Sequence, residues 1–494
     1  MLGWLEPVRA WLSNDGALIL PQIQLAIFAL GLLLTDFWLD EKQKSWNAWT
    51  ALAGIGFSAY SLWRLKDLQT TGFGGTILID PFFVFFSFIF LASAALVILL
   101  SMRYLEIEGE HHGEFYALVL FATIGMMFMA SGIDLVVLFI ALETMAITFY
   151  VLAGFLRGSK KSNEGALKYM LLGAFSSGLL AYGFSLLFGL GGSTALPQIL
   201  RGVVQADPGN LLVTVAMVTI LAGMLFKVAA VPFHQWAPDV YEGAPTSITA
   251  FLSVASKAAS FAMLLRIFLT VFWPVKGSWE VMLAAVAIAT LTWGNFAALT
   301  QSNLKRLLAY SSIGHAGYIL LGLVAYAANP SSTTGLKGIA FYILAYAFMN
   351  TGAFAIIIIL RRKGLIGDEI EDVQGLYYRS PAAAVVLLLF MLSLAGIPPT
   401  AGFIGKYFIF LALIEAKRYT LAVLAVVYVV PALYYYFRIV SAAWMRDSND
   451  PVAPTVSAPA ALALTVAAFV TLVAGIYPEP FIRIANYSLF YLGR

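Results

Sequence analysis

Long runs of hydrophobic residues, separated by short polar segments, recur along almost the whole chain. A helix of about 20 apolar residues crosses roughly 30 Å of hydrocarbon, and the runs have about this length. The pattern therefore predicts an all-α polytopic membrane protein with about fourteen transmembrane helices. We expect the spans near 17–36, 46–63, 81–102, 115–131, 134–156, 166–190, 211–231, 246–272, 279–300, 307–328, 336–361, 381–412, 420–445 and 457–476.

Two intervening segments, 65–79 and 194–208, mix polar and apolar residues too closely to span a membrane. We expect both to be surface or interfacial segments. No loop exceeds about thirty residues, so the pattern predicts no separate soluble domain.

The seventh and twelfth spans are interrupted by proline, and each carries one lysine. Their sequences are LAGMLFKVAAVPFHQWAP and SLAGIPPTAGFIGKYFIF. Proline breaks a helix interior, and irregular backbone at membrane depth persists where it is buried in protein or lines a polar cavity. We therefore predict two half-helices in each span. The residues concerned are Lys227, Pro232 and Pro238 in the first segment and Pro398, Pro399, Gly402, Gly405 and Lys406 in the second.

The broken helices and the ionisable residues recur at similar offsets. Lys227 and Lys406 are 179 positions apart, while Glu143 in span five and His315 in span ten are 172 apart. Both offsets correspond to five spans, and an odd number turns the second unit upside down in the membrane. Such inverted repeats with broken helices point to a transport site. The predicted organisation is an N-terminal three-helix segment (1–113), a first repeat of spans four to eight (114–272), an inverted repeat of spans nine to thirteen (273–446), and a C-terminal helix and tail (447–494).

Composition agrees with a membrane protein and restricts its chemistry. Hydrophobic residues make up 61%, charged residues 11%, and mean hydropathy is +0.87. The net charge of +3 is small and scattered, which argues against a nucleic acid partner. Cysteine is absent, which excludes disulfides, thiolate-bound iron–sulfur clusters and c-type haem. We expect no cofactor or metal in this chain, and any redox chemistry in other chains.

Basic residues in the loops predict the orientation. Lys and Arg are more frequent in the odd-numbered loops than in the even-numbered loops, and basic loops face the cytoplasm. With an even number of spans, both termini would lie outside. The first residues lack a basic start followed by an apolar stretch, so we expect no cleavable signal peptide.

Five ionisable residues fall well inside apolar spans, where a charge is costly and marks an ion or proton route. They are Glu143, Lys227, Lys257, His315 and Lys406. Structural alternatives exist, because Glu143 could pair with a lysine, Lys257 could extend to the membrane surface, and His315 could be a hydrogen-bonded core residue. Lys168 is a sixth candidate, although it follows Glu164 at i+4, as in a helix-surface pair.

Lysine suits proton transfer in a membrane interior because burial favours its neutral form, while a nearby carboxylate favours the protonated form. Movement of Glu143 toward or away from a lysine would load or release a proton. Hydroxyl side chains could hold waters between the ionisable groups; they are Thr249, Ser253, Ser256, Tyr310, Ser311 and Ser312. The hypothesis is a lateral polar axis with half-channels on either side.

Five long motifs cover much of the region from about 80 to 480. They are DLVVLFIALETMAITFYVLAGF, ALKYMLLGAFSSGLLAYG, FKVAAVPFHQWAPDVYEGAPTSITAFLSVASKAA, LKRLLAYSSIGHAGYILLG and LAGIPPTAGFIGKYFIF. These motifs resemble the antiporter-like, Mrp-related membrane subunits of respiratory complex I. The resemblance is strongest to the subunit N family, because Lys257 and Lys406 fit it and no long lateral helix follows the last spans.

The resemblance implies fourteen transmembrane helices in two inverted five-helix repeats and a proton-translocating role in NADH-quinone oxidoreductase. It matches Glu143 to the carboxylate of span five and Lys227 to the lysine of span seven. Lys257 matches the connecting lysine of span eight, and Lys406 the exit-side lysine of span twelve. His315 and Lys168 fall at further polar positions of the same axis.

The resemblance also implies partners and a location. The expected partners are other membrane-arm subunits, including a second antiporter-like subunit and small helical subunits, in an energy-transducing bacterial inner membrane. FMN, iron–sulfur clusters and quinone are expected in partner subunits. Subunits of multisubunit cation/proton antiporters and membrane-bound hydrogenases share the fold, as do ferredoxin-dependent plastid and cyanobacterial equivalents. A stand-alone transporter and a structural membrane scaffold are the alternatives from other classes.

Overall fold

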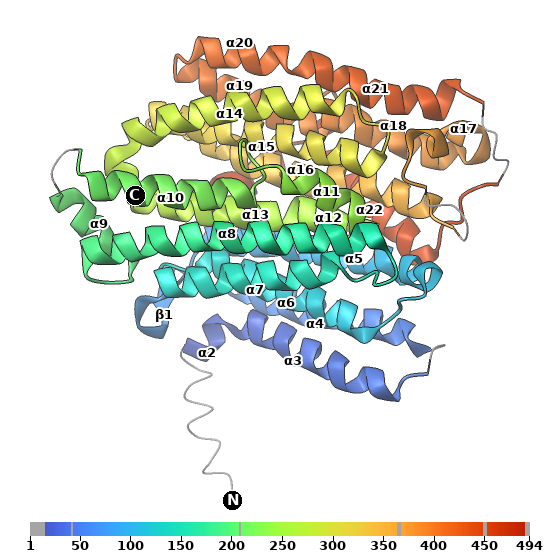
Figure 1. The fold of residues 1–494 in the computed structure, drawn as a ribbon, viewed down its shortest axis with the longest axis horizontal. Coiled ribbons are helices and arrows are strands. Elements are labelled where there is room, and N and C mark those ends of the chain that lie inside the picture. The colour runs from blue at the N-terminus through green and yellow to red at the C-terminus, as the bar shows by residue number, and fades with distance from the viewer. Residues whose placement is uncertain (1–14, 41–42, 207–208, 363–366, 448–451, 490–494) are drawn as a thin grey trace, which may run out of the picture.

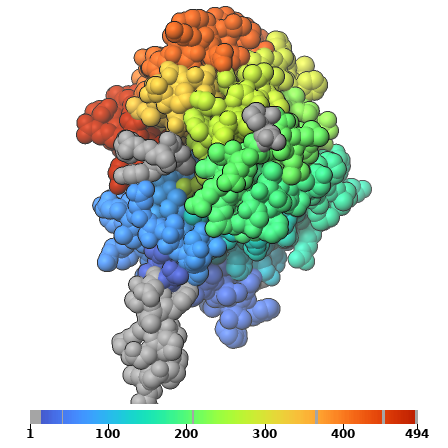
Figure 2. All heavy atoms as spheres, turned by 90° about the vertical axis from the view of Figure 1, so that its left-hand side faces the viewer, coloured from blue at the N-terminus to red at the C-terminus, as the bar shows by residue number. Residues whose placement is uncertain are grey.

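A computed structural model describes residues 15–40, 43–206, 209–362, 367–447 and 452–489. Long helices lie side by side with their axes roughly aligned (Figure 1). The N-terminal helices lie at one edge of this bundle and α20 at the opposite edge, and the end-on view in Figure 2 shows the same progression. The expected all-α architecture is present.

The helices of the first half have the following bounds: α2 Asp15–Leu18, α3 Leu20–Thr35, α4 Ser45–Arg64, α5 Pro81–Glu108, α6 Gly113–Ser131, α7 Leu135–Ala153, α8 Lys160–Gly191, α9 Leu196–Gln205, α10 Leu211–Lys227, α11 Trp236–Gly243, α12 Thr246–Phe251 and α13 Lys257–Thr270. A π-helical turn, Leu252–Ser256, joins α12 to α13 without a break.

The helices of the second half are α14 Lys276–Ala298, α15 Leu304–Ala328, α16 Thr334–Leu360, α17 Leu376–Arg379, α18 Pro381–Ala395, α19 Ala401–Glu415, α20 Tyr419–Val427, α21 Val429–Met445, α22 Ala458–Ile476 and α23 Glu479–Leu489. Short 3₁₀ turns occupy Asp36–Trp38, Phe73–Gly75, Trp273–Val275 and Ile370–Val373. Every range expected to span the membrane contains helix.

Within the described ranges, eleven helical segments are long and apolar enough to cross a membrane, and α10 and α18 are shorter apolar helices. The centre of the bundle is the segment Thr246–Thr270, whose most apolar stretch is completely buried. The helices around it, α5, α15 and α16, are also mostly buried. By contrast, only 28% of the residues in the most apolar stretches of α3 and of the α20–α21 segment are buried, as expected of helices that face lipid or partner subunits.

The two segments expected at the surface have regular structure. In 65–79 the chain forms an antiparallel hairpin of β1 Thr70–Gly72 and β2 Ile77–Ile79. The other segment, 194–208, contains the ten-residue helix α9, which buries Leu196, Ile199 and Val203 along one face. Sequence pattern alone did not predict the hairpin, because its strands have only three residues each.

Both predicted helix breaks are confirmed. Helix α10 ends at Lys227, and residues 228–235 are not regular helix before α11 begins at Trp236. Helix α18 ends at Ala395, followed by Gly396 with φ 86° in the left-handed region that favours glycine, and α19 begins at Ala401. The two breaks leave unsatisfied backbone groups inside the bundle, where buried side chains can bind them.

Candidate functional site

Four of the predicted site residues are buried in the centre of the bundle. The exposed fractions are 3% for Lys227, 4% for Lys257, 4% for His315 and 3% for Lys406. Three of them lie at or beside an irregularity in a helix: the end of α10, the π turn before α13, and the break between α18 and α19. Because ammonium groups are costly to bury, these positions require specific partners or a neutral amine.

Lys227 is the last residue of α10, and its Nζ has no hydrogen-bond partner among the described residues. The Nζ atom lies 6.0 Å from the centre of the Tyr150 ring and 5.7 Å from that of Phe226. Glu143, on α7, is half-buried and accepts a hydrogen bond from the Ser177 hydroxyl of α8. No ion pair joins Glu143 to Lys227 in the described part of the chain.

Lys257 begins α13 directly after the π turn. Its Nζ donates to the backbone carbonyl of Ser312 on α15, at 2.8 Å, and to the Ser312 hydroxyl. The Tyr241 hydroxyl of α11 lies 3.5 Å from the same Ser312 hydroxyl. The π turn directly before Lys257 is an irregularity of a kind that is frequent at functional sites.

His315 lies one helical turn from Ser312 on α15. Its Nδ1 is 2.6 Å from the Tyr342 hydroxyl, and its Nε2 is 3.0 Å from the Tyr436 hydroxyl. The Tyr436 hydroxyl also contacts the Ser311 hydroxyl. A small cavity between α13, α15 and α16 is lined by Lys257, Ser312 and His315, so these groups share one buried space.

Lys406 binds the broken end of α18. Its Nζ donates to the carbonyls of Leu394, at 3.1 Å, and Ala395, at 2.7 Å, and lies 5.0 Å from the centre of the Tyr318 ring. The last carbonyls of a helix have no intrahelical partner and carry the negative end of its dipole. Lys406 therefore satisfies the acceptors that the break exposes.

The prolines and glycines of the breaks have different roles. Pro232 lies in the irregular segment 228–235, and Pro398 and Pro399 lie between α18 and α19. Pro238 instead falls in the first turn of α11, where a missing N–H is tolerated, so it does not interrupt that helix. In α19, a Cβ at Gly402 would overlap the Ser393 carbonyl oxygen.

Gly405 has a similar packing role, because its Cβ would lie 2.9 Å from Cδ2 of Tyr342 on α16. The two glycines of α19 thus permit close packing against α18 and α16.

Lys168 lies outside this buried group. On α8 it forms ion pairs with Glu164 at 2.7 Å and Asp239 at 2.8 Å, and its side chain is 43% exposed. The i+4 pair considered from the sequence is confirmed. A role of Lys168 in the polar axis stays a prediction.

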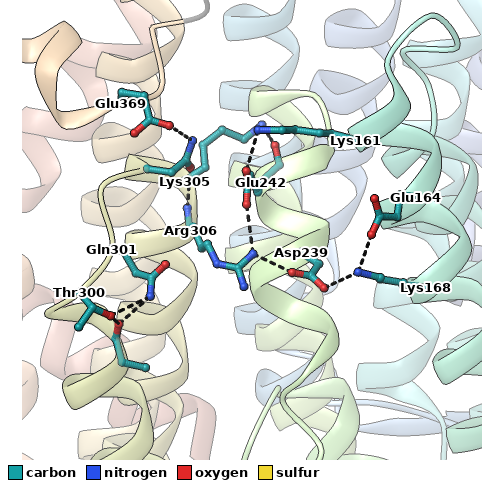
Figure 3. Close-up of polar contacts among 12 residues, drawn as sticks. Lys161, Glu164, Lys168, Asp239, Glu242, Thr300, Gln301, Lys305, Arg306 and Glu369 are labelled. Carbon is teal, nitrogen blue, oxygen red and sulfur yellow. Dashed lines mark hydrogen bonds and ion pairs between the residues drawn. The ribbon is translucent and has the colours of Figure 1, made fainter.

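Two features were not predicted from the sequence. Arg266 on α13 forms a fully buried bidentate ion pair with Asp80, at 2.7 and 3.1 Å, and also donates to the Ala130 carbonyl. The sequence contains a signal for this ion pair, because Arg266 is a second cation inside the apolar span that contains Lys257 and a buried cation needs a partner. The other feature is a network of ion pairs around Asp239 and Glu242 of α11, shown in Figure 3.

The side chains of this arrangement have the chemistry needed to carry protons. Lysine and histidine can each bind and release a proton, and the hydroxyls of Ser312, Tyr342 and Tyr436 can both donate and accept hydrogen bonds. Among the described residues, no group of three or more His, Asp and Glu side chains could hold a metal ion.

Broken helices and buried ionisable side chains define an antiporter-like integral membrane protein, and comparison with known proteins agrees. The family model described as "NADH:quinone oxidoreductase/Mrp antiporter, TM" matches residues 132–430. NADH-quinone oxidoreductase subunit N 1 of Koribacter versatilis is 53% identical over 489 residues, with 96% of each chain covered. NADH-quinone oxidoreductase subunit N 2 of Solibacter usitatus is 51% identical over 490 residues, covering 97% of this chain and 98% of the relative.

Among solved structures, a chain of respiratory complex I from Thermus thermophilus with bound aureothin is 32% identical. It superposes with a TM-score of 0.79, covering 94% of this chain and 98% of that chain. The present chain therefore belongs to the antiporter-like family of NADH-quinone oxidoreductase subunit N, as its sequence motifs predicted.

Proposed function

We propose that this chain translocates protons in the membrane arm of an NADH-quinone oxidoreductase, where quinone reduction in partner subunits drives the pumping. Glu143, Lys227, Lys257, His315 and Lys406 form its route. The observation that carries the proposal is the buried Lys257–Ser312 pair, which is joined by two hydrogen bonds and lines one cavity together with His315, in the most deeply buried part of the bundle. Ionisable groups at such depth are costly unless they serve transport.

The two ends of the route differ in a way that suits directional transfer. Lys227 lacks a hydrogen-bond partner among the described atoms, whereas Lys406 donates to two carbonyls of α18. A group without a fixed partner can gain or lose a proton with little rearrangement, while a bound ammonium releases its proton when the helix end moves. Glu143, beside the first lysine along the route, would couple it to the neighbouring subunit.

The full proposal includes the organisation of the chain. Fourteen membrane crossings form two inverted repeats, 114–272 and 273–446, between an N-terminal segment, 1–113, and a C-terminal segment, 447–494. Both termini face outward from the cytoplasm, although residues 1–14 and 490–494 lie outside the described residues. The chain holds no redox cofactor; FMN, iron–sulfur clusters and quinone belong to partner subunits.

Lys227→Ala in the assembled complex tests the proposal. We expect normal assembly on a native gel and normal NADH oxidation with a water-soluble artificial acceptor. Quinone-coupled NADH oxidation and proton pumping into membrane vesicles should both fall, because the two processes are linked. Lys276→Ala, at a lysine that stacks on Trp273 at the start of α14, is the matched control and should pump like the parent.

The alternatives predict other results. A membrane scaffold predicts that Lys227→Ala assembles and pumps normally. A subunit of a cation/proton antiporter or of a membrane-bound hydrogenase predicts that the chain purifies with a complex that does not oxidise NADH. Pumping that disappears when sodium is removed from the buffer would contradict the choice of the proton.

A further inference from the structure

Helix α11 has only eight residues and follows an irregular segment, so it has little stability of its own. It nevertheless lies between two long helices, α8 and α15, whose Lys161 and Arg306 side chains reach it from opposite sides in Figure 3. Its position must therefore be fixed by contacts with these neighbours. Its buried side chains, among them Trp236, Val240 and Tyr241, pack in the interior, and two acidic residues add charged contacts with both neighbours.

Two acidic residues of α11, Asp239 and Glu242, each bind cations from both neighbouring helices. Asp239 pairs with Lys168 of α8 at 2.8 Å and with Arg306 of α15 at 2.7 Å. Glu242 pairs with Lys161 of α8 at 2.8 Å and with Arg306 at 3.1 Å. Because Arg306 reaches both carboxylates, the network ties α11 to α15 through one side chain and to α8 through two (Figure 3).

Lys305, next to Arg306, binds the C-terminal end of α11. It is 5% exposed, and its Nζ donates to the carbonyls of Glu242, at 2.7 Å, and Ala244, at 2.6 Å. A cation at this position satisfies unpaired carbonyls and complements the helix dipole. We refer to Lys161, Lys168, Lys305 and Arg306, with Asp239 and Glu242, as the α11 clamp.

Backbone packing shows how closely the clamp holds the helix. A Cβ at Gly243 would overlap the Lys161 carbonyl oxygen, and a Cβ at Gly165 would lie 3.3 Å from the Asp239 carbonyl oxygen. Helix α11 therefore packs directly on the backbone of α8. Small displacements cannot be absorbed by side chains at this contact.

Helix α11 contacts both of the buried lysines of the first repeat through their neighbours. At its start, the Trp236 indole donates to the Phe226 carbonyl at 2.9 Å, beside Lys227. In its middle, the Tyr241 hydroxyl lies 3.5 Å from the Ser312 hydroxyl that accepts from Lys257. The position of α11 thus affects the surroundings of both lysines.

We propose that the residues of the α11 clamp are positioning residues. They fix α11 so that Trp236 and Tyr241 keep the surroundings of Lys227 and Lys257 in the geometry needed for proton transfer. This inference rests on the proposed function. It gives Lys168 a role different from that of a proton carrier. Because a single partly exposed ion pair contributes little stability, loss of one clamp contact should affect coupling more than folding.

Arg306→Ala in the assembled complex removes both ion pairs to α15. We expect parental assembly and artificial-acceptor activity, with proton pumping reduced at least about threefold. Arg306→Lys should restore part of the rate, because lysine keeps the charge but lacks the planar guanidinium whose Nη1 binds both carboxylates. Lys160→Ala, at an exposed position beside Lys161 and outside the clamp, is the control and should pump like the parent.

A double-mutant cycle separates positioning from proton carriage. Lys168→Gln and Asp239→Asn should each slow pumping, and the double variant should be no slower than the worse single variant, because both changes break the Lys168–Asp239 ion pair that the two residues share. The cycle also carries the test if Arg306→Ala fails to assemble. Fully additive losses of pumping rate, or parental pumping in all three variants, would contradict the proposed positioning role of the clamp.

Lys227→Ala, measured in parallel, distinguishes the two levels of inference. Impaired pumping by Lys227→Ala together with parental pumping by the clamp variants would contradict the clamp alone. Parental pumping by Lys227→Ala would contradict the proposed function itself.

Discussion

Lys257 on α13 and Ser312 on α15 meet through two hydrogen bonds, one to the backbone carbonyl and one to the hydroxyl of the serine. The same hydroxyl lies within reach of Tyr241 on α11. Ser312 therefore joins the π-bulged helix, the half-helix and the helix that carries His315. In the proposed route, this serine is the junction between the first repeat and the second.

Ser312→Ala should slow proton pumping about tenfold, because it removes a hydrogen bond to a charged donor worth about 1.5–3 kcal/mol. The carbonyl contact remains, so assembly should be unchanged. Ser312→Thr keeps the hydroxyl and should retain most of the activity. Pumping rates in vesicles, normalised to the amount of assembled complex, provide the measurement, and equal rates for the Ala and Thr variants would contradict the role of the hydroxyl.

Much of this site could be predicted from residue type and placement. A lysine inside an apolar span beside proline is energetically unusual, and Lys227 and Lys406 were found in this way. The π turn before Lys257 has no such signal, because its residues, LSVAS, would also fit an ordinary helix. The contact of Lys257 with Ser312 could not be predicted either, since it depends on how two distant helices pack.

Lys406 allows proton transfer to be separated from helix capping. Arginine can donate to the carbonyls of Leu394 and Ala395 as lysine does, but it does not deprotonate in proteins. Lys406→Arg should therefore assemble like the parent and lose most proton pumping, measured as acidification of membrane vesicles driven by NADH. Near-normal pumping by this variant would mean that Lys406 acts only as a cap.

Gly402 tests the packing of the second broken helix. Since a Cβ there would overlap the Ser393 carbonyl oxygen, Gly402→Ala must push α19 away from α18 at a cost of about 1–3 kcal/mol. We expect slower pumping and a lower temperature for loss of activity. Gly56→Ala is the matched control, because a Cβ at Gly56 meets no atom within 4 Å. Heat inactivation of both variants provides the comparison, and identical curves would contradict the packing argument.

The ion pair between Arg266 and Asp80 could not be predicted from the sequence. Arg266 lies inside the apolar span 246–272, where its charge needs a partner as much as that of Lys257 does. The partner, Asp80, also accepts a hydrogen bond from the Phe83 amide as the N-cap residue of α5. Only the fold brings these residues together, because 186 positions separate them.

The Arg266–Asp80 pair makes a prediction about stability. Removing one partner of a buried ion pair leaves an uncompensated charge and costs about 3–5 kcal/mol. Arg266→Met should therefore reduce the amount of assembled complex on native gels, whereas Arg103→Met, at an exposed arginine of α5, should not. Asp80→Asn combined with Arg266→Met removes both charges and keeps a side-chain oxygen for the Phe83 amide. The double variant should recover assembly relative to Arg266→Met, and failure to do so would assign the loss to packing rather than to the unpaired charge.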